Sequence, residues 1–167
     1  MGKAPSYDLN SSSDAQTCGI RHIGIGIYST GKIREYLLKK GFSCEAADEA
    51  VTNLVKREYI NDERAGRKVL LSRSGKKQES RSYIRQRLLA AGISRDASDL
   101  LMNEVAQDSE LCFNLYLSLK PSVSDNDEAL DSKDELIKTA GRRGFGFETS
   151  QNAYDRWLRK VTDDSKE

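Results

Sequence analysis

The residue types that support catalysis are sparse in this sequence. His22 is the only histidine, and the three cysteines, Cys18, Cys44 and Cys112, lie far apart without a C-x-x-C pair. A general base, an activated nucleophile or a zinc site normally needs several such side chains close together. Gly24-Ile25-Gly26 is too short for a nucleotide-binding loop, and no phosphate loop with its Gly-Lys-Ser/Thr ending occurs. We therefore expect a protein that is not an enzyme and that has no metal and no cofactor.

The same residues bear on where the protein works. An odd number of separated cysteines argues against a disulfide framework and favours a reducing, cytoplasmic compartment. No apolar run is long enough to span a bilayer, and the first residues lack the charged-then-apolar layout of a signal peptide. We therefore expect no membrane association.

Charge is the chemistry that this chain does offer. The net charge is only +1, but the charges are segregated along the sequence. Between Arg64 and Arg87 the only acid is Glu79, whereas between Asp96 and Glu135 acids dominate. Such a basic stretch predicts a patch for phosphates or for an acidic protein surface, with a solvated helical face as the alternative. The residues that we predict to bind a partner or nucleic acid are Arg64, Arg67, Lys68, Arg73, Lys76, Lys77, Arg81, Arg85 and Arg87.

The elements that carry these charges are indicated by an internal repeat. Three serine–glycine pairs share one separation: Ser29 with Gly41, Ser80 with Gly92, and Ser132 with Gly144. Aligning the glycines brings apolar residues into register at helical spacing, among them Ile33, Ile84 and Leu136, then Leu37, Leu88 and Ala140, then Phe42, Ile93 and Phe145. A period of about fifty residues with this pattern indicates one helical unit used three times. Arrays of this kind usually present a surface to a partner instead of a catalytic pocket.

Each repeat, which we call a module, predicts helix, tight turn, helix and a third helix. The serine is the expected N-cap of the first helix, with a capping box at Ser132 and Glu135, and the glycine ends that helix in a left-handed conformation. Ser43 is expected to cap the second helix of the first module, and Asn61 is expected to open its third helix. The fold class that we predict is all-α, with tandem three-helix modules, the last truncated, forming an elongated curved array.

The predicted domain organisation follows from these boundaries. We expect a disordered N-terminal tail over 1–17, module 1 over 18–75 and module 2 over 76–121. An acidic flexible linker over 122–131 then leads to a two-helix module 3 over 132–161 and a polar tail over 162–167. The glycines Gly19, Gly24 and Gly26 weaken the expectation of a helix over 18–27.

Three segments of the chain resemble the RecX family of bacterial recombination regulators. Residues 28–42 (Tyr-Ser-Thr through Lys-Gly-Phe) resemble its first module, and residues 59–64 (Tyr-Ile-Asn-Asp-Glu-Arg) resemble its Leu-x-Asp-Asp-Glu-Arg segment. Residues 84–93 resemble its Ile-Arg-x-x-Leu-x-x-x-Gly-Ile box, and the similarity extends over residues 28–160. Ala65-Gly66 departs from the family's Phe-Ala at that place and removes an aromatic anchor.

The resemblance implies a non-enzymatic, monomeric regulator. A protein of this family binds RecA and its DNA filament and modulates the recombinase and ATPase activities of RecA. Our interpretation is that it inhibits them. The resemblance also implies that the protein contacts DNA weakly or through the filament. The residues themselves indicate only a helical repeat with a basic face. An alternative is a helix-turn-helix transcription regulator, in which residues 33–60 form the DNA-reading unit. Against it, the second helices are acidic, with Glu45, Asp48 and Glu49 in the first of them.

Overall fold

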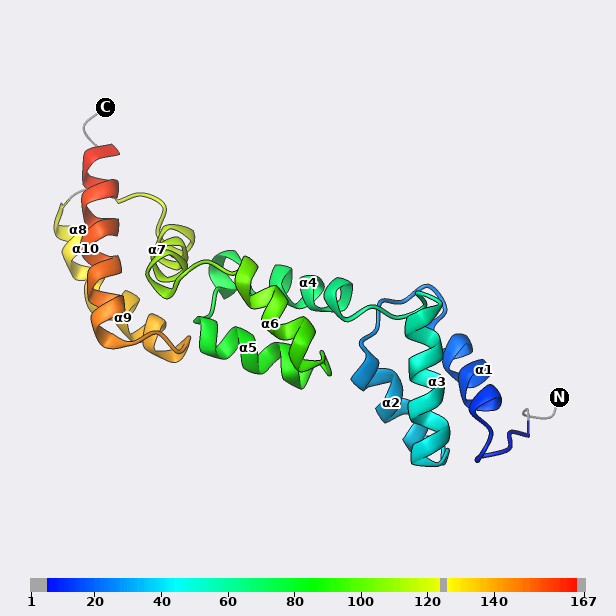
Figure 1. The fold of residues 1–167 in the computed structure, drawn as a ribbon. Helices are drawn as coiled ribbons and strands as arrows, with labels where there is room; N and C mark the ends of the chain where they lie inside the picture. The colour runs from blue at the N-terminus through cyan, green and yellow to red at the C-terminus, as the bar shows by residue number, and fades with distance from the viewer. Residues whose placement is uncertain (1–5, 124–125, 165–167) are drawn as a thin grey trace. The chain divides into compact units, whose positions relative to one another are not determined.

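The computed structural model describes residues 6–123 and 126–164, and all regular structure in these ranges is helical (Figure 1). The expected all-α class is confirmed, whereas the elongated curved array and the module boundaries stay predictions. The helices are α1 (Ser12–Ile23), α2 (Thr30–Lys39), α3 (Cys44–Lys56), α4 (Asp62–Ser72), the 3-10 helix η1 (Gly75–Lys77), α5 (Arg81–Ala90), α6 (Arg95–Glu104), α7 (Asp108–Leu119), α8 (Asn126–Asp131), α9 (Lys133–Arg142) and α10 (Phe147–Asp164). None of the helices in the described residues is both long and apolar enough to cross a membrane.

The chain forms two compact units. Unit 1 comprises residues 1–68 and 88–99, and unit 2 comprises residues 69–87 and 100–167. Consequently α4, α5 and α6 each contribute residues to both units.

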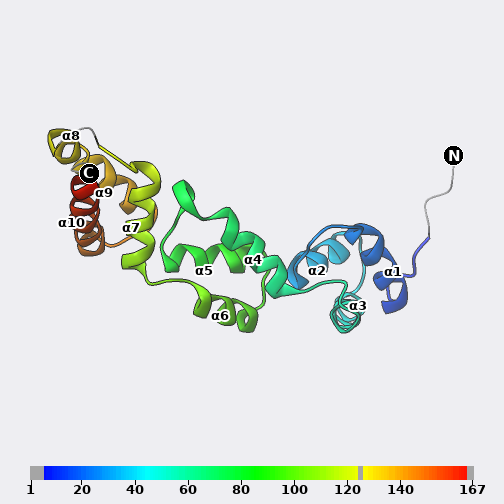
Figure 2. The same cartoon turned by 90° about the horizontal axis from the view of Figure 1, so that it is seen from above.

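Unit 1 is built around α1, α2 and α3, which pack on one another (Figure 2). Ile33 and Leu37 on α2 and Leu54 on α3 are completely buried in its core. Burying side chains of this size contributes about 1.5–3 kcal/mol each. Helix α1 comes close because Gly19 has no side chain: a Cβ there would lie 3.0 Å from Cδ1 of Leu54.

The N-terminal prediction is therefore wrong in part. Helix α1 starts at Ser12, inside the tail that we expected to be disordered over 1–17, and continues to Ile23 despite its glycine. Ser11 caps it by accepting a hydrogen bond from the amide of Asp14 at 3.2 Å. Packing of Ala15 and Cys18 into the core outweighs the low helix propensity of the segment. Residues 1–5 of the predicted tail lie outside the described residues.

The three glycine turns have the local geometry that the repeat predicts. Gly41, Gly92 and Gly144 have φ values of 95°, 76° and 85°, in the left-handed region that favours glycine. After each glycine, the amide of the next residue bonds back to a carbonyl of the preceding helix, as in a Schellman cap. These pairs are Phe42 to Leu37, Ile93 to Leu88, and Phe145 to Ala140.

The predicted N-caps are confirmed for α2, α3 and α4 but not for α9. Ser29, Ser43 and Asn61 accept from the amides of Lys32, Ala46 and Arg64. The capping box at Ser132 is wrong, because this serine has helical backbone angles and its hydroxyl donates to the carbonyl of Glu128. The preceding α8 runs almost directly into α9 and supplies that carbonyl.

Helix α8 also corrects the predicted flexible linker over 122–131. Residues 126–131 are helical, and Lys120 forms an ion pair with Glu128 at 3.5 Å. The acids Asp127 and Glu128 in its first turn interact favourably with the positive end of the helix. Residues 124–125 of the linker lie outside the described residues.

Unit 2 has its core where α10 packs on α7 and α9. Trp157 is completely buried, and its indole nitrogen donates to the carbonyl of Lys120 at 2.8 Å. The hydroxyl of Tyr116 likewise donates to the carbonyl of Ser150 at 3.2 Å. Because α10 continues to Asp164, the tail predicted over 162–167 is helical in its first part, and residues 165–167 lie outside the described residues.

Two aspartates cap equivalent helices. In unit 1 the Asp62 carboxylate accepts from the amide and hydroxyl of Thr30, at 2.8 and 2.9 Å, and from the amide of Ser94 at 2.8 Å. In unit 2 the Asp108 carboxylate accepts from the amide of Arg81 at 2.7 Å. Each aspartate thus satisfies an amide in the first turn of the helix that follows a repeat serine.

Candidate binding surface

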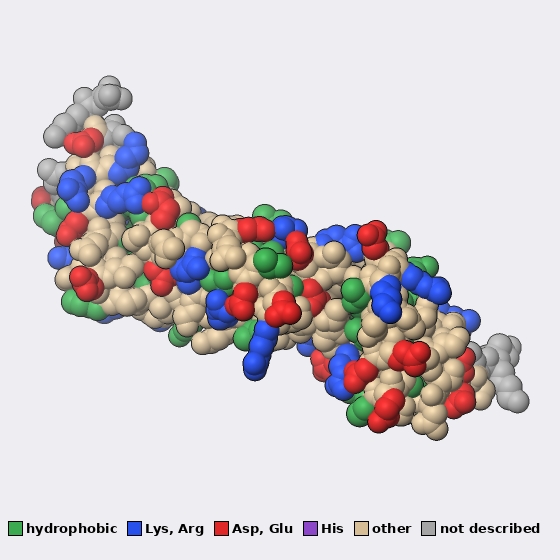
Figure 3. Space-filling view, in the orientation of Figure 1, with side chains coloured by type: hydrophobic (Ala, Val, Ile, Leu, Met, Phe, Trp, Pro, Cys, Tyr) green, Lys and Arg blue, Asp and Glu red, His purple; other side chains and the backbone are tan. Residues whose placement is uncertain are grey.

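The predicted binding residues are divided between the two units. Arg64, Arg67 and Lys68 belong to unit 1, and the predicted residues from Arg73 to Arg87 belong to unit 2. Acidic and basic side chains are interspersed over the face drawn in Figure 3. The structure gives these residues different surroundings.

Arg81 is held by the end of a neighbouring helix. Its guanidinium donates to the carbonyls of Met102 and Ala106 at 3.0 and 3.1 Å, and also to that of Val105. These are orphan carbonyls at the C-terminal end of α6, where a cation is favoured. The side chain of Arg81 is therefore occupied within unit 2.

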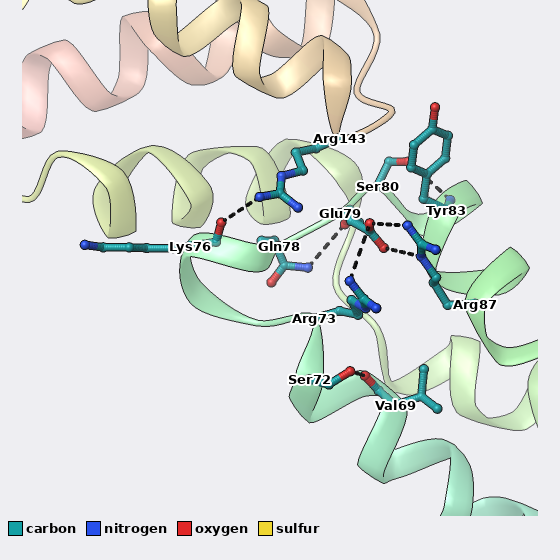
Figure 4. A network of polar contacts seen from close by, with 10 residues as sticks. All are labelled: Val69, Ser72, Arg73, Lys76, Gln78, Glu79, Ser80, Tyr83, Arg87 and Arg143. Atoms are coloured by element: carbon teal, nitrogen blue, oxygen red, sulfur yellow. Dashed lines mark hydrogen bonds and ion pairs between the residues drawn. The ribbon is translucent and has the colours of Figure 1, made fainter. Parts of the chain in front are cut away.

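Glu79 gathers two of the predicted arginines. Its side chain is 3% exposed and lies between Arg73 and Arg87 (Figure 4). Arg87 makes a bidentate pair with it at 3.0 and 3.2 Å, and Arg73 lies 4.0 Å away. The hydrogen bond and charge of Glu79 raise the pKa of Arg87. Since a buried carboxylate is costly without partners, this cluster has a structural role.

Lys76 and Lys77 form the exposed part of the stretch. They lie on η1, whose backbone is held by Arg143: its guanidinium donates to the carbonyl of Lys76 at 3.3 Å (Figure 4). The side chain of Lys76 points away from this network. Among the described residues, no acidic partner is found for the ammonium group of either lysine. We call this exposed pair the η1 lysines.

The remaining predicted residues lie on α4 and α5. Arg64 and Lys68 are exposed on α4, and Arg67 pairs with Glu63 at 3.3 Å. Arg85 is exposed on α5. An exposed ion pair of this kind contributes at most about 1 kcal/mol to stability.

Sequence reasoning missed two features of this surface. Charge counting identifies Glu79 only as the single acid of the basic stretch, and its burial between Arg73 and Arg87 is a tertiary feature. Arg143 comes from the glycine turn after α9, and its approach to η1 is a tertiary contact without a local signal in the sequence. Within residues 6–123 and 126–164, no group of three or more His, Cys, Asp or Glu residues is placed to hold a metal ion.

Two known proteins are similar to this chain over most of its length. It is 27% identical over 144 residues to the "Regulatory protein RecX" of Pelodictyon phaeoclathratiforme, covering 86% of this chain and 89% of that protein. It is 23% identical over 138 residues to the "Regulatory protein RecX" of Chlorobium limicola, covering 83% and 86%. No protein-family model matches the chain. The two relatives support the family assignment that the sequence led us to expect.

Proposed function

We propose that this chain, as a member of the RecX family, is a regulatory protein that acts on RecA. In this proposal it binds the RecA filament on DNA and lowers recombinase and ATPase activity without catalysing a reaction itself. Two kinds of observation support it: the relatives named regulatory proteins, and the three segments that resemble the family in register.

The observation that carries the binding mode is the exposure of the η1 lysines. These lysines have no carboxylate partner among the described residues. They can therefore bind phosphates or acidic side chains without first breaking an ion pair. Arg81 and Arg87 are hydrogen-bonded to protein oxygens, and Arg73 lies 4.0 Å from Glu79. We therefore propose that these arginines shape the surface and that the lysines make the contact.

Co-sedimentation with RecA filaments tests the proposal. The Lys76→Glu/Lys77→Glu variant should bind filaments more weakly and keep its helicity, because both side chains are exposed. If the lysines contact phosphates, the slope of log K against log salt should shrink by about 0.7–0.9 for each contact removed. Arg81 is left unchanged, since its loss would disturb α6.

The matched control is the Lys56→Glu/Lys138→Glu variant, which makes the same charge change at exposed positions elsewhere. If both variants lose filament affinity equally, the effect arises from the change in net charge and not from a contact made by the η1 lysines. If the unmodified protein does not co-sediment with RecA filaments, the RecA proposal is refuted.

The helix-turn-helix alternative finds less support. Helices α2 and α3 do flank the Gly41 turn, but the exposed side of α3 carries Glu45, Asp48 and Glu49. A recognition helix must enter a groove lined by phosphates, which such a surface repels.

A further inference from the structure

A second surface, in unit 1, combines aromatic rings with lysines. A hollow of about 280 Å³, open to solvent, is lined by His22, Tyr28, Lys32, Glu35, Tyr36 and Lys39. We call it the α1–α2 cleft. Ligand pockets usually start at about 300 Å³, so this one has room for a small planar group instead of a large ligand.

The aromatic side chains of the cleft form a stack. The rings of His22 and Tyr36 lie 3.7 Å apart and nearly parallel, at 9°. Tyr28 lies 5.1 Å from His22 at 43°, and its side chain is half-buried. Gly26 lets the loop approach this ring, because a Cβ there would lie 2.5 Å from Tyr28. Tyr28 and Tyr36 also pack against the core of unit 1, but all three rings are only half-buried, and the surface that they leave exposed lines the cleft.

The charges around the rings favour an anion. Glu35 pairs with Lys32 at 3.0 Å and with Lys39 at 2.7 Å, so two ammonium groups share one carboxylate. Lys40 adds a further cation, with its nitrogen 5.4 Å from the centre of the Tyr36 ring. Both pairs are exposed, and exposed pairs contribute little, so a phosphate can displace Glu35 from the lysines.

We propose that the α1–α2 cleft binds single-stranded nucleic acid directly, with a base stacked on the aromatic rings and a phosphate held by Lys32 and Lys39. Stacking faces beside a basic track are the combination by which proteins hold single strands without reading their sequence. The inference does not rest on the proposed action on RecA, and it concerns a surface distinct from the η1 lysines.

The test uses the full chain and a short fluorescent oligothymidylate, with binding followed by anisotropy in the absence of RecA. Tyr28→Leu should weaken binding about five- to 150-fold, and Tyr28→Phe should restore it, because the ring and not the hydroxyl stacks. Lys39→Gln should lower the salt slope by about 0.7. Glu35→Gln should tighten binding, because it frees both lysines.

Tyr59→Leu and Lys56→Gln serve as matched controls, since both residues are exposed in unit 1 outside the cleft. Inorganic polyphosphate and poly-glutamate serve as competitors without bases. The proposal is overturned if Tyr28→Leu binds as the unmodified chain does, or if polyphosphate competes as well as the oligonucleotide per phosphate. Preference for poly-glutamate would assign the cleft to an acidic peptide instead. If the Tyr28→Leu variant loses helicity, the test rests on Lys39→Gln and Glu35→Gln. The proposal is then overturned if both of these variants bind the oligonucleotide with unchanged affinity.

Discussion

The backbones of Gly31 and Gly92 touch inside unit 1. The amide of Gly31, in the first turn of α2, donates to the carbonyl of Gly92 at 3.0 Å. Beside it the hydroxyl of Ser29 donates to the carbonyl of Ala91 at 2.6 Å. A Cβ on Gly31 would lie 2.6 Å from the Gly92 oxygen, so this approach excludes any side chain.

Gly31→Ala should therefore destabilise unit 1. Alanine favours a helix by about 1 kcal/mol over glycine, but a backbone clash of this kind costs more, and we expect a net loss of about 1–3 kcal/mol. Hydrogen exchange of the α2 amides measures it. The control is Gly141→Ala on α9, where a Cβ meets nothing within 4 Å and the free energy of unfolding should rise. A Gly31→Ala variant as stable as the original chain would show that α2 can shift away.

Asp62→Ala should also weaken unit 1. Its carboxylate accepts three hydrogen bonds, from Thr30 and Ser94, and their loss leaves two backbone amides unsatisfied. We expect unfolding to become easier by about 2–4 kcal/mol, measured by urea denaturation with exchange readout in α2.

The neighbouring Glu63→Ala is its control, because Glu63 forms an exposed ion pair with Arg67. Loss of that pair should lower the free energy of unfolding by less than about 1 kcal/mol. Equal effects of the two variants would contradict a capping role for Asp62.

Local patterns predicted most of the helices and their ends. The glycines that end α2, α5 and α9, and the caps Ser29, Ser43 and Asn61, depend on a few adjacent residues, and all are found as expected. Helix α1 was missed because its stability comes from burial of Ala15 and Cys18 against distant helices. The α8 helix was missed because it is short and acidic, and Ser132 then lost its expected role.

The candidate surfaces, like the helices, could be predicted from the sequence only in part. Charge counting found the basic stretch, but only tertiary contacts reveal that Arg81 holds α6 carbonyls and that Glu79 collects Arg73 and Arg87. The α1–α2 cleft was overlooked, because its rings come from His22, Tyr28 and Tyr36, which no short motif connects.

Thiol reactivity should separate the cysteines. Burial raises the pKa of Cys112 to about 11, whereas Cys44 is exposed. In a native alkylation experiment at neutral pH, Cys44 should react first and Cys112 should stay protected until unfolding. Because the folded-state pKa of Cys112 is raised from 9, its contribution to stability is present below pH 9 and is lost as the pH rises through 11. Rapid labelling of Cys112 would show that the contact of α7 with α10 opens easily.

Glu79→Gln distinguishes a structural from a binding role for the arginines around it. The change removes the buried charge that Arg73 and Arg87 share, and we expect the free energy of unfolding to fall by about 1–3 kcal/mol, since both guanidiniums can still reach water. The local positive charge rises by one, so the affinity for RecA filaments should increase if the η1 lysines contact phosphate or acidic side chains. Glu63→Gln makes the same charge change at an exposed site on α4 and should leave both quantities nearly unchanged. Weaker filament binding by a folded Glu79→Gln variant would mean instead that Glu79 orients the arginines toward the partner, and the contact would then include Arg73 and Arg87.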